Sequence, residues 1–133
     1  MGATPVFVDV YDSTFNIDCE KLEIAVQTII KDGKLNPKAI IPVDLFGVPA
    51  RYRLIDDIAK KYNLKVIEDA AQSFGGSIGD YKVGTFGDVA ATSFYPPKPL
   101  GCYGDGGAIF THDDVLAEKM RKMVNHGMED RYH

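Results

Sequence analysis

The sequence predicts an α/β protein with a mainly parallel sheet and helices on both faces. Short segments rich in apolar and β-branched residues alternate with longer segments whose apolar residues recur at helical spacing. A strand, helix, strand, helix, strand order is typical of right-handed βαβ units, which produce parallel strands. The chain has 133 residues, 45% of them hydrophobic and 26% charged, which suits one globular domain.

Two strands and one helix are expected in the first part of the chain. Residues 6–10 are β-branched and aromatic, which predicts a first strand. Asp18 is a suitable N-cap for a helix with one apolar face, and Gly33 is a suitable end for it. Residues 39–43 form a continuous apolar run, which predicts a strand buried on both sides.

The second part of the chain continues the alternation. Residues 54–62 predict an amphipathic helix with Asn63 as a left-handed stop, and residues 65–69 predict the next strand. After a glycine-rich interval, residues 89–94 and 108–111 predict two more strands. A last helix is expected to begin at Asp113 or Asp114 and to end at Gly127, which lies just past its apolar residues.

Composition excludes several functional classes. A formal net charge of -4 and the lack of a basic stripe argue against nucleic-acid binding. No apolar run approaches the roughly 18 residues of a transmembrane helix, and the first residues do not resemble a signal peptide, so a cytoplasmic protein is expected. Cys19 and Cys102 lack metal-ligand spacing and are expected to be free thiols, and no metal site is predicted.

The stretch 93–107 is the strongest candidate for chemistry. Three prolines surround Lys98 and fix φ, so this stretch is predicted to be a rigid irregular loop, and its glycines permit positive φ or close approaches. A lysine held on such a loop has little freedom to lose when it reaches an electrophile. The alternative is a solvated surface lysine, which is the common case for a loop.

Polar residues at two predicted strand ends support the chemical interpretation. Asp69 and Gln72 follow one strand, and Ser93 lies at the end of the next, before Lys98. A lysine that forms an imine, a carboxylate that keeps a ring nitrogen protonated and a hydroxyl for a phosphate are the groups that pyridoxal phosphate chemistry requires. Considered alone, Asp69 could be an ordinary turn or cap residue at a strand end, and Ser93 alone does not indicate a function.

Residues 68–73, 93–101 and 104–108 together resemble nucleotide-sugar aminotransferases of the DegT/DnrJ/EryC1/StrS type, which have the fold-type I architecture. The resemblance implies that Lys98 forms the imine with pyridoxal phosphate and moves the substrate proton. It implies that Asp69 pairs with the pyridine nitrogen, Gln72 contacts the 3′-hydroxyl side and Ser93 binds the phosphate. Related dehydratases carry histidine at the lysine position, so Lys98 favours transamination.

The resemblance also implies substrates and partners. Residues 97–111 are most similar to enzymes that aminate UDP-linked 3-keto hexuronic acids with glutamate as donor, in the synthesis of polysaccharide sugars. Members are expected to be homodimers. Tyr95 and His126 are further substrate-site candidates, although an aromatic residue after a strand is more often a packing residue, and a place at a helix C-terminus is a sufficient structural reason for His126.

Members of this family are longer than 133 residues. By resemblance, residues 1–133 correspond to the middle of the cofactor-binding large domain, without the N-terminal segment and the small C-terminal domain. The segments expected upstream supply further phosphate ligands, so this chain alone is expected to bind cofactor weakly and not to turn over. The alternative function is a catalytically silent domain that binds a phosphorylated ligand or dimerises.

Overall fold

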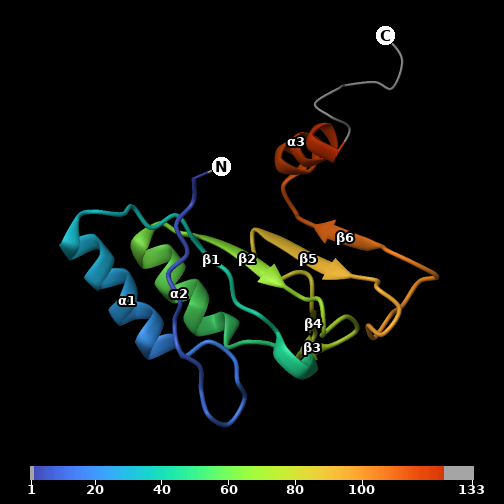
Figure 1. The fold of residues 1–133 in the computed structure, drawn as a ribbon, viewed down its shortest axis with the longest axis horizontal. Helices are drawn as coiled ribbons and strands as arrows, with labels where there is room; N and C mark the ends of the chain where they lie inside the picture. The colour runs from blue at the N-terminus through green and yellow to red at the C-terminus, as the bar shows by residue number, and fades with distance from the viewer. Residues whose placement is uncertain (1, 125–133) are drawn as a thin grey trace.

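The computed structural model describes residues 2–124, which form a four-stranded sheet, three α-helices and a small hairpin (Figure 1). The sheet contains, in spatial order, β1 (Ala39–Ile40), β2 (Lys65–Asp69), β5 (Val89–Ser93) and β6 (Gly107–Phe110). The helices are α1 (Cys19–Asp32), α2 (Tyr52–Tyr62) and α3 (Asp114–Val124), with a short 3₁₀ turn η1 (Leu45–Gly47). The hairpin pairs β3 (Ser77–Ile78) with β4 (Tyr81–Lys82).

The predicted mainly parallel sheet is confirmed. β1, β2 and β5 run parallel, with Ile40 beside Val66 and Asp69 beside Ala91. β6 pairs antiparallel with β5, because the chain returns through a loop without a crossover helix. The carboxyl ends of β2 and β5 therefore meet at one edge of the sheet, where the loops that follow them begin.

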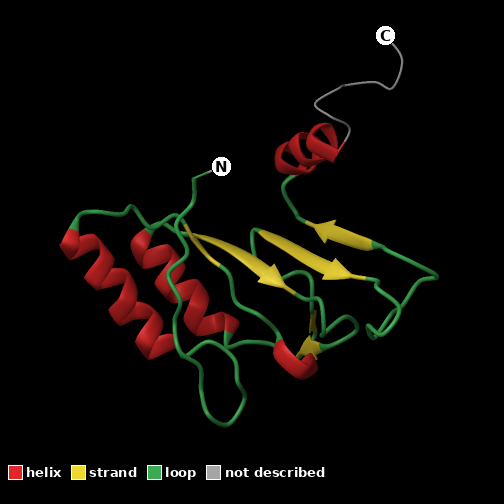
Figure 2. Ribbon diagram, viewed as in Figure 1, coloured by secondary structure: helices red, strands yellow, loops and turns green. Residues whose placement is uncertain are grey.

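The first two helices lie where the sequence predicts them. The Asp18 side chain accepts hydrogen bonds from the Glu20 and Lys21 backbone amides, and Gly33 ends α1 at φ 69°. Asn63 ends α2 at φ 53°, also in the left-handed region. α2 packs against β2 and α1 packs against α2, so the two helices lie side by side (Figure 2).

The predicted strand at residues 6–10 is wrong. Among these residues only Val10 pairs, in an isolated antiparallel bridge with Ile17, and Phe7 is 92% exposed. A β-branched segment becomes a strand only when a neighbouring strand accepts its hydrogen bonds. Within the described residues no strand of the sheet reaches this segment.

The expectation that residues 39–43 are buried on both sides is also wrong for the described residues. The strand proper covers only Ala39–Ile40, and Val43 adds an isolated parallel bridge to Asp69. Ile40 is 4% exposed, whereas its neighbour Ile41 is 60% exposed. Successive side chains of a strand point to opposite faces, so one face of the sheet is covered by α2 and the other is open.

The covered face contains a carboxylate. Glu68 lies on β2 among the buried side chains and is 0% exposed. Its two oxygens accept hydrogen bonds from the Gly84 amide at 2.7 Å and the Phe86 amide at 3.0 Å. Burial raises the pKa of Glu68, and these bonds oppose the rise. Glu68 thus fixes the segment before β5 to the sheet.

Among the described residues, no helix is long and apolar enough to cross a membrane.

Candidate active site

Asp69 and Ser93 lie on the same face of the sheet at the ends of adjacent strands. Asp69 pairs with Ala91 in the parallel register, and Ser93 follows two residues later. Because side chains alternate along a strand, Ala91 and Ser93 point to the face on which Asp69 lies. This is the open face, opposite buried Glu68, and both residues are partly accessible there.

The Asp69 carboxylate is held firmly at this edge. One of its oxygens accepts a hydrogen bond from the Ala71 amide at 3.1 Å. Its backbone amide donates to the Pro42 carbonyl and its carbonyl accepts from the Asp44 amide, at 2.9 and 3.0 Å. Within residues 2–124 the second carboxylate oxygen accepts no hydrogen bond, which leaves it available to a ligand.

Gln72 has a defined amide orientation. Its Oε1 accepts a hydrogen bond from the Phe46 backbone amide at 2.9 Å. A backbone N–H can only donate, so the group it meets must be the oxygen of the Gln72 amide. The Nε2 group of Gln72 is therefore the end available to donate to a ligand acceptor.

Lys98 lies on an irregular loop between β5 and β6, as predicted. The Lys98 amide donates to the Tyr95 carbonyl at 2.8 Å, and the Ser93 hydroxyl accepts from the Tyr95 amide at 3.2 Å. The base of the loop is closed by two bonds of 2.7 Å, from the Cys102 amide to the Phe94 carbonyl and from the Phe94 amide to the Gly106 carbonyl. The loop thus has internal hydrogen bonds close to the lysine.

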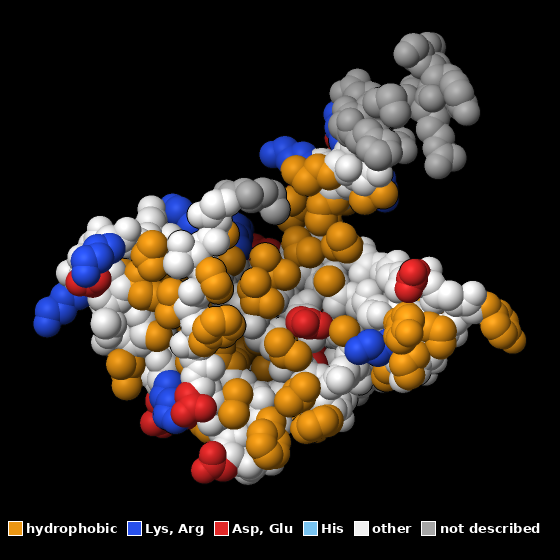
Figure 3. Space-filling view, viewed as in Figure 1, with side chains coloured by type: hydrophobic (Ala, Val, Ile, Leu, Met, Phe, Trp, Pro, Cys, Tyr) orange, Lys and Arg blue, Asp and Glu red, His pale blue; other side chains and the backbone are white. Residues whose placement is uncertain are grey.

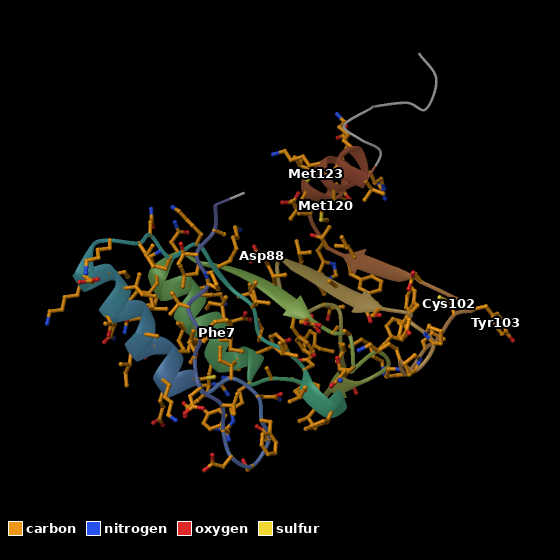
Figure 4. The ribbon with its side chains drawn as sticks, viewed as in Figure 1. Phe7, Asp88, Cys102, Tyr103, Met120 and Met123 are labelled. Carbon is orange, nitrogen blue, oxygen red and sulfur yellow. The ribbon has the colours of Figure 1, made fainter. Side chains whose placement is uncertain are left out.

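The side chains of this loop divide into two groups. Lys98 is partly buried, whereas Tyr95 is 52% exposed and Tyr103 is fully exposed. Figure 4 shows Cys102 and Tyr103 at the outer tip of the loop, with Tyr103 pointing away from the sheet. Lys98 is consequently better enclosed than the two tyrosines of the loop.

Gly101 allows the lysine loop to close. A Cβ atom at this position would lie 2.3 Å from the Pro96 carbonyl oxygen, a distance that no Cβ tolerates. Gly101→Ala is therefore expected to force the loop open and to lower the free energy of unfolding by about 1–3 kcal/mol, the usual cost of overpacking. Chemical denaturation of the full-length protein measures the change. Cys102→Ala, which shortens an exposed neighbour, is the matched control, and equal stability of the two variants would contradict the prediction.

A separate apolar hollow lies between β6 and α3. It has a volume of about 1130 Å³ and is lined by residues that include Phe74, Phe110 and Met120. Figure 4 shows Met120 on the side of α3 toward the sheet. Figure 3 shows hydrophobic side chains where α3 meets the rest of the molecule. Its lining contains neither Asp69 nor Lys98, but it includes Ala91, which pairs with Asp69, and Gly107, which pairs with Ser93, so the hollow borders the candidate site.

The remaining sequence expectations have mixed outcomes. His126 lies outside the described residues. Cys19 and Cys102 are free thiols, as expected, and residues 2–124 contain no group of three or more side chains that could hold a metal ion. The sequence did not predict the hydrogen bond between the Phe46 amide and Gln72. It also did not predict that the Asp44 carboxylate, two residues before Phe46, is buried.

The model of the DegT/DnrJ/EryC1/StrS aminotransferase family matches residues 1–133. The chain belongs to this family. The family resemblance expected from residues 68–73, 93–101 and 104–108 is thereby confirmed, together with a mainly parallel α/β fold that corresponds to part of a fold-type I protein.

Individual members of the aminotransferase family are closely similar to this chain. A UDP-2-acetamido-2-deoxy-3-oxo-D-glucuronate aminotransferase of Pseudomonas aeruginosa is 50% identical over 133 residues, which are 100% of this chain and 35% of that protein. A UDP-N-acetyl-3-dehydro-alpha-D-glucosamine 3-aminotransferase of Acidithiobacillus ferrooxidans is 44% identical, again over 100% of this chain and 34% of that protein. The chain spans about a third of the length of the curated relatives it matches.

Solved structures of the family have the same fold. A crystal structure of a DegT DnrJ EryC1 StrS aminotransferase from Brucella abortus has a TM-score of 0.96 and 56% identity, and the match covers 99% of this chain and 36% of that one. The structure of DesV from S. venezuelae, in complex with a ketimine intermediate, has a TM-score of 0.88 and 38% identity over 99% of this chain and 34% of that one.

Proposed function

We propose that this chain is part of the large domain of a pyridoxal phosphate-dependent aminotransferase that aminates a keto nucleotide-diphosphate sugar. The observation that carries the proposal is the position of Asp69 and Ser93 on one face at adjacent strand ends, with the Lys98 loop directly after the second strand. In open α/β sheets, ligands bind beyond the carboxyl ends of the strands. Family membership and the names of the relatives agree with this chemistry.

The residues at this edge fit pyridoxal phosphate. The free oxygen of Asp69 would hold the pyridine nitrogen in its protonated form, and the Nε2 group of Gln72 would donate to the 3′-oxygen. The Ser93 hydroxyl would bind the phosphate while still accepting from the Tyr95 amide, because a hydroxyl both donates and accepts. When bound, the cofactor supplies an electron sink for the carbanion of the substrate.

Lys98 would have two roles. Its amine would hold the cofactor covalently until an amino substrate takes its place. Once free, the Lys98 Nζ would act as general base at the substrate carbon that carries the nitrogen and would later return the proton. The hydrogen-bonded turn at Tyr95 keeps the backbone of Lys98 in place during both roles.

The proposed substrate is a UDP-linked 3-keto hexuronic acid, with glutamate as amino donor. A relative that is 50% identical over the whole chain is named for such a sugar, which supports this choice. Tyr95, which is exposed beside the lysine turn, and His126 are the proposed substrate contacts. We further propose a homodimeric, cytoplasmic enzyme of polysaccharide sugar synthesis, in which residues 1–133 alone are inactive.

Reductive trapping in the full-length protein tests the proposal. The holoenzyme is expected to absorb visible light, and borohydride treatment is expected to fix the cofactor to the peptide that contains Lys98. Mass spectrometry of the digested protein locates the modification. Trapping on a different lysine, or no trapping in protein saturated with pyridoxal phosphate, would contradict the proposed role of Lys98.

A further inference from the structure

The turn at residues 44–47 begins with a buried carboxylate. Asp44 is 0% exposed, and its Oδ1 accepts hydrogen bonds from the Ala50 amide at 2.9 Å and the Tyr52 hydroxyl at 2.8 Å. Its Oδ2 accepts from the Ser73 hydroxyl at 3.1 Å. A buried charge is tolerated only when it is satisfied in this way. Asp44 thus joins the start of α2 to the segment that follows Asp69.

The same turn contacts both proposed cofactor residues at the carboxyl end of β2, Asp69 and Gln72. The Asp44 amide donates to the Asp69 carbonyl at 3.0 Å. Two residues later, the Phe46 amide donates to Gln72 Oε1 at 2.9 Å. Ser73, which donates to Asp44, is the next residue after Gln72. The 44–47 turn therefore holds the Gln72 side chain directly, through the Phe46 amide. It also holds the Gln72 backbone indirectly, through the bond between Asp44 and Ser73.

Phe46 adopts a backbone conformation that is uncommon for its residue type. Its φ is 56° and its ψ is 22°, in the left-handed region that bulky residues rarely occupy. Phe46 is 72% exposed, and its ring packs edge-on against the Phe15 ring, at 6.2 Å between centroids. Burial of the ring does not account for the conformation. The conformation directs the Phe46 amide at Gln72. Strained backbone conformations of this kind are typically kept at functional sites.

We infer that Asp44 and Phe46 are positioning residues for Gln72. In this arrangement the Phe46 amide fixes Gln72 Oε1, so that Nε2 points to the ligand, and the Asp44 carboxylate holds Ser73, so that the backbone of Gln72 cannot move away. The inference rests on the proposed function, because it assumes that Gln72 donates to the 3′-oxygen of pyridoxal phosphate. Neither residue touches the reacting atoms.

Two variants that each remove one side-chain hydrogen bond from Asp44 test the inference in the full-length protein. Ser73→Ala removes the bond that reaches the Gln72 segment, whereas Tyr52→Phe removes a bond on the side of α2 and keeps the ring stacked on Phe86. Both are expected to lower Tm by similar amounts. Only Ser73→Ala is expected to raise the Kd of pyridoxal phosphate, by about tenfold, the value of one hydrogen bond to a charged group.

A spectroscopic readout separates positioning from stability. A weaker Gln72 bond to the 3′-oxygen is expected to change the pH at which the visible band of the holoenzyme titrates in Ser73→Ala, but not in Tyr52→Phe. Should Ser73→Ala fail to fold, Ser73→Cys keeps a weak donor of similar size and is expected to shift Kd in the same direction.

The outcomes distinguish this inference from the proposed function. Equal Kd values and band titrations in the two variants, with normal cofactor binding in the unmodified enzyme, would overturn the positioning role alone. Failure of the unmodified full-length enzyme to bind pyridoxal phosphate would overturn both proposals. A selective effect of Ser73→Ala would support the positioning role.

Discussion

Replacing Lys98 with alanine is expected to lower the kcat of the full-length enzyme by about 10³-fold or more. The variant loses the amine that bonds to the cofactor and the general base at the substrate carbon, and one such base typically contributes about 10²–10⁴-fold. Steady-state assays of amino transfer from glutamate to the keto sugar measure the loss. The loop itself should persist, because the hydrogen bonds that close it do not involve the Lys98 side chain.

Lys119→Ala is the matched control for Lys98→Ala. Lys119 is an exposed lysine on α3, away from the proline-rich loop, and its loss should leave kcat unchanged. If Lys98→Ala retained activity, or if cofactor binding were indifferent to it, the aminotransferase assignment of this residue would be wrong. The alternative of a catalytically silent phosphate-binding or dimerisation domain would then be favoured.

Asp69→Asn is expected to lower kcat by about 10²–10³-fold, the usual loss when a preorganised electrostatic group is removed. Asparagine keeps an oxygen that can accept from the Ala71 amide, so the strand end should keep its shape. It lacks the negative charge that keeps a pyridine nitrogen protonated. The visible spectrum and kcat of the full-length variant together measure the effect.

The control for Asp69→Asn is the same change at Asp80, an exposed residue between β3 and β4. Asp80→Asn should leave both the spectrum and kcat unchanged. Full activity in Asp69→Asn would show that the charge is not required and would remove Asp69 from the proposed site.

The helices and the inner strands could be predicted from the sequence because their signals are local. Asp18 and Gly33 mark the two ends of α1, and Asn63 marks the end of α2. These residues act through bonds and backbone angles within a few positions of themselves. The same holds for the lysine loop, whose prolines and glycines determine its backbone directly.

Features that depend on distant partners could not be predicted in this way. Residues 6–10 have strand propensity, but their pairing depends on a neighbour that local pattern does not reveal. The hairpin of β3 and β4 did have a local signal, since Gly79-Asp80 is a two-residue turn with Gly79 at φ 58°. The short strands on either side obscured it within the glycine-rich interval.

The candidate site shows the same division. The positions of Asp69 and Ser93 at strand ends and of Lys98 on the following loop were predictable, because the apolar runs and the proline-rich motif identify them. The orientation of Gln72 was not, because it depends on Phe46, a residue that rarely adopts a left-handed conformation. Asp44 and Glu68 look like surface acids in the sequence, and only their hydrogen-bond partners explain their burial.

The antiparallel pairing of β5 with β6 has a consequence for the order of folding. Ser93 pairs with Gly107, 14 residues away, whereas Val89 is 22 residues from Ile67 and Lys65 is 26 residues from Ala39. Closing a short loop costs less chain entropy than joining distant strands, and local pairings accelerate folding. We therefore expect the segment around Lys98 to form early and to protect its amides from hydrogen exchange before the parallel strands assemble.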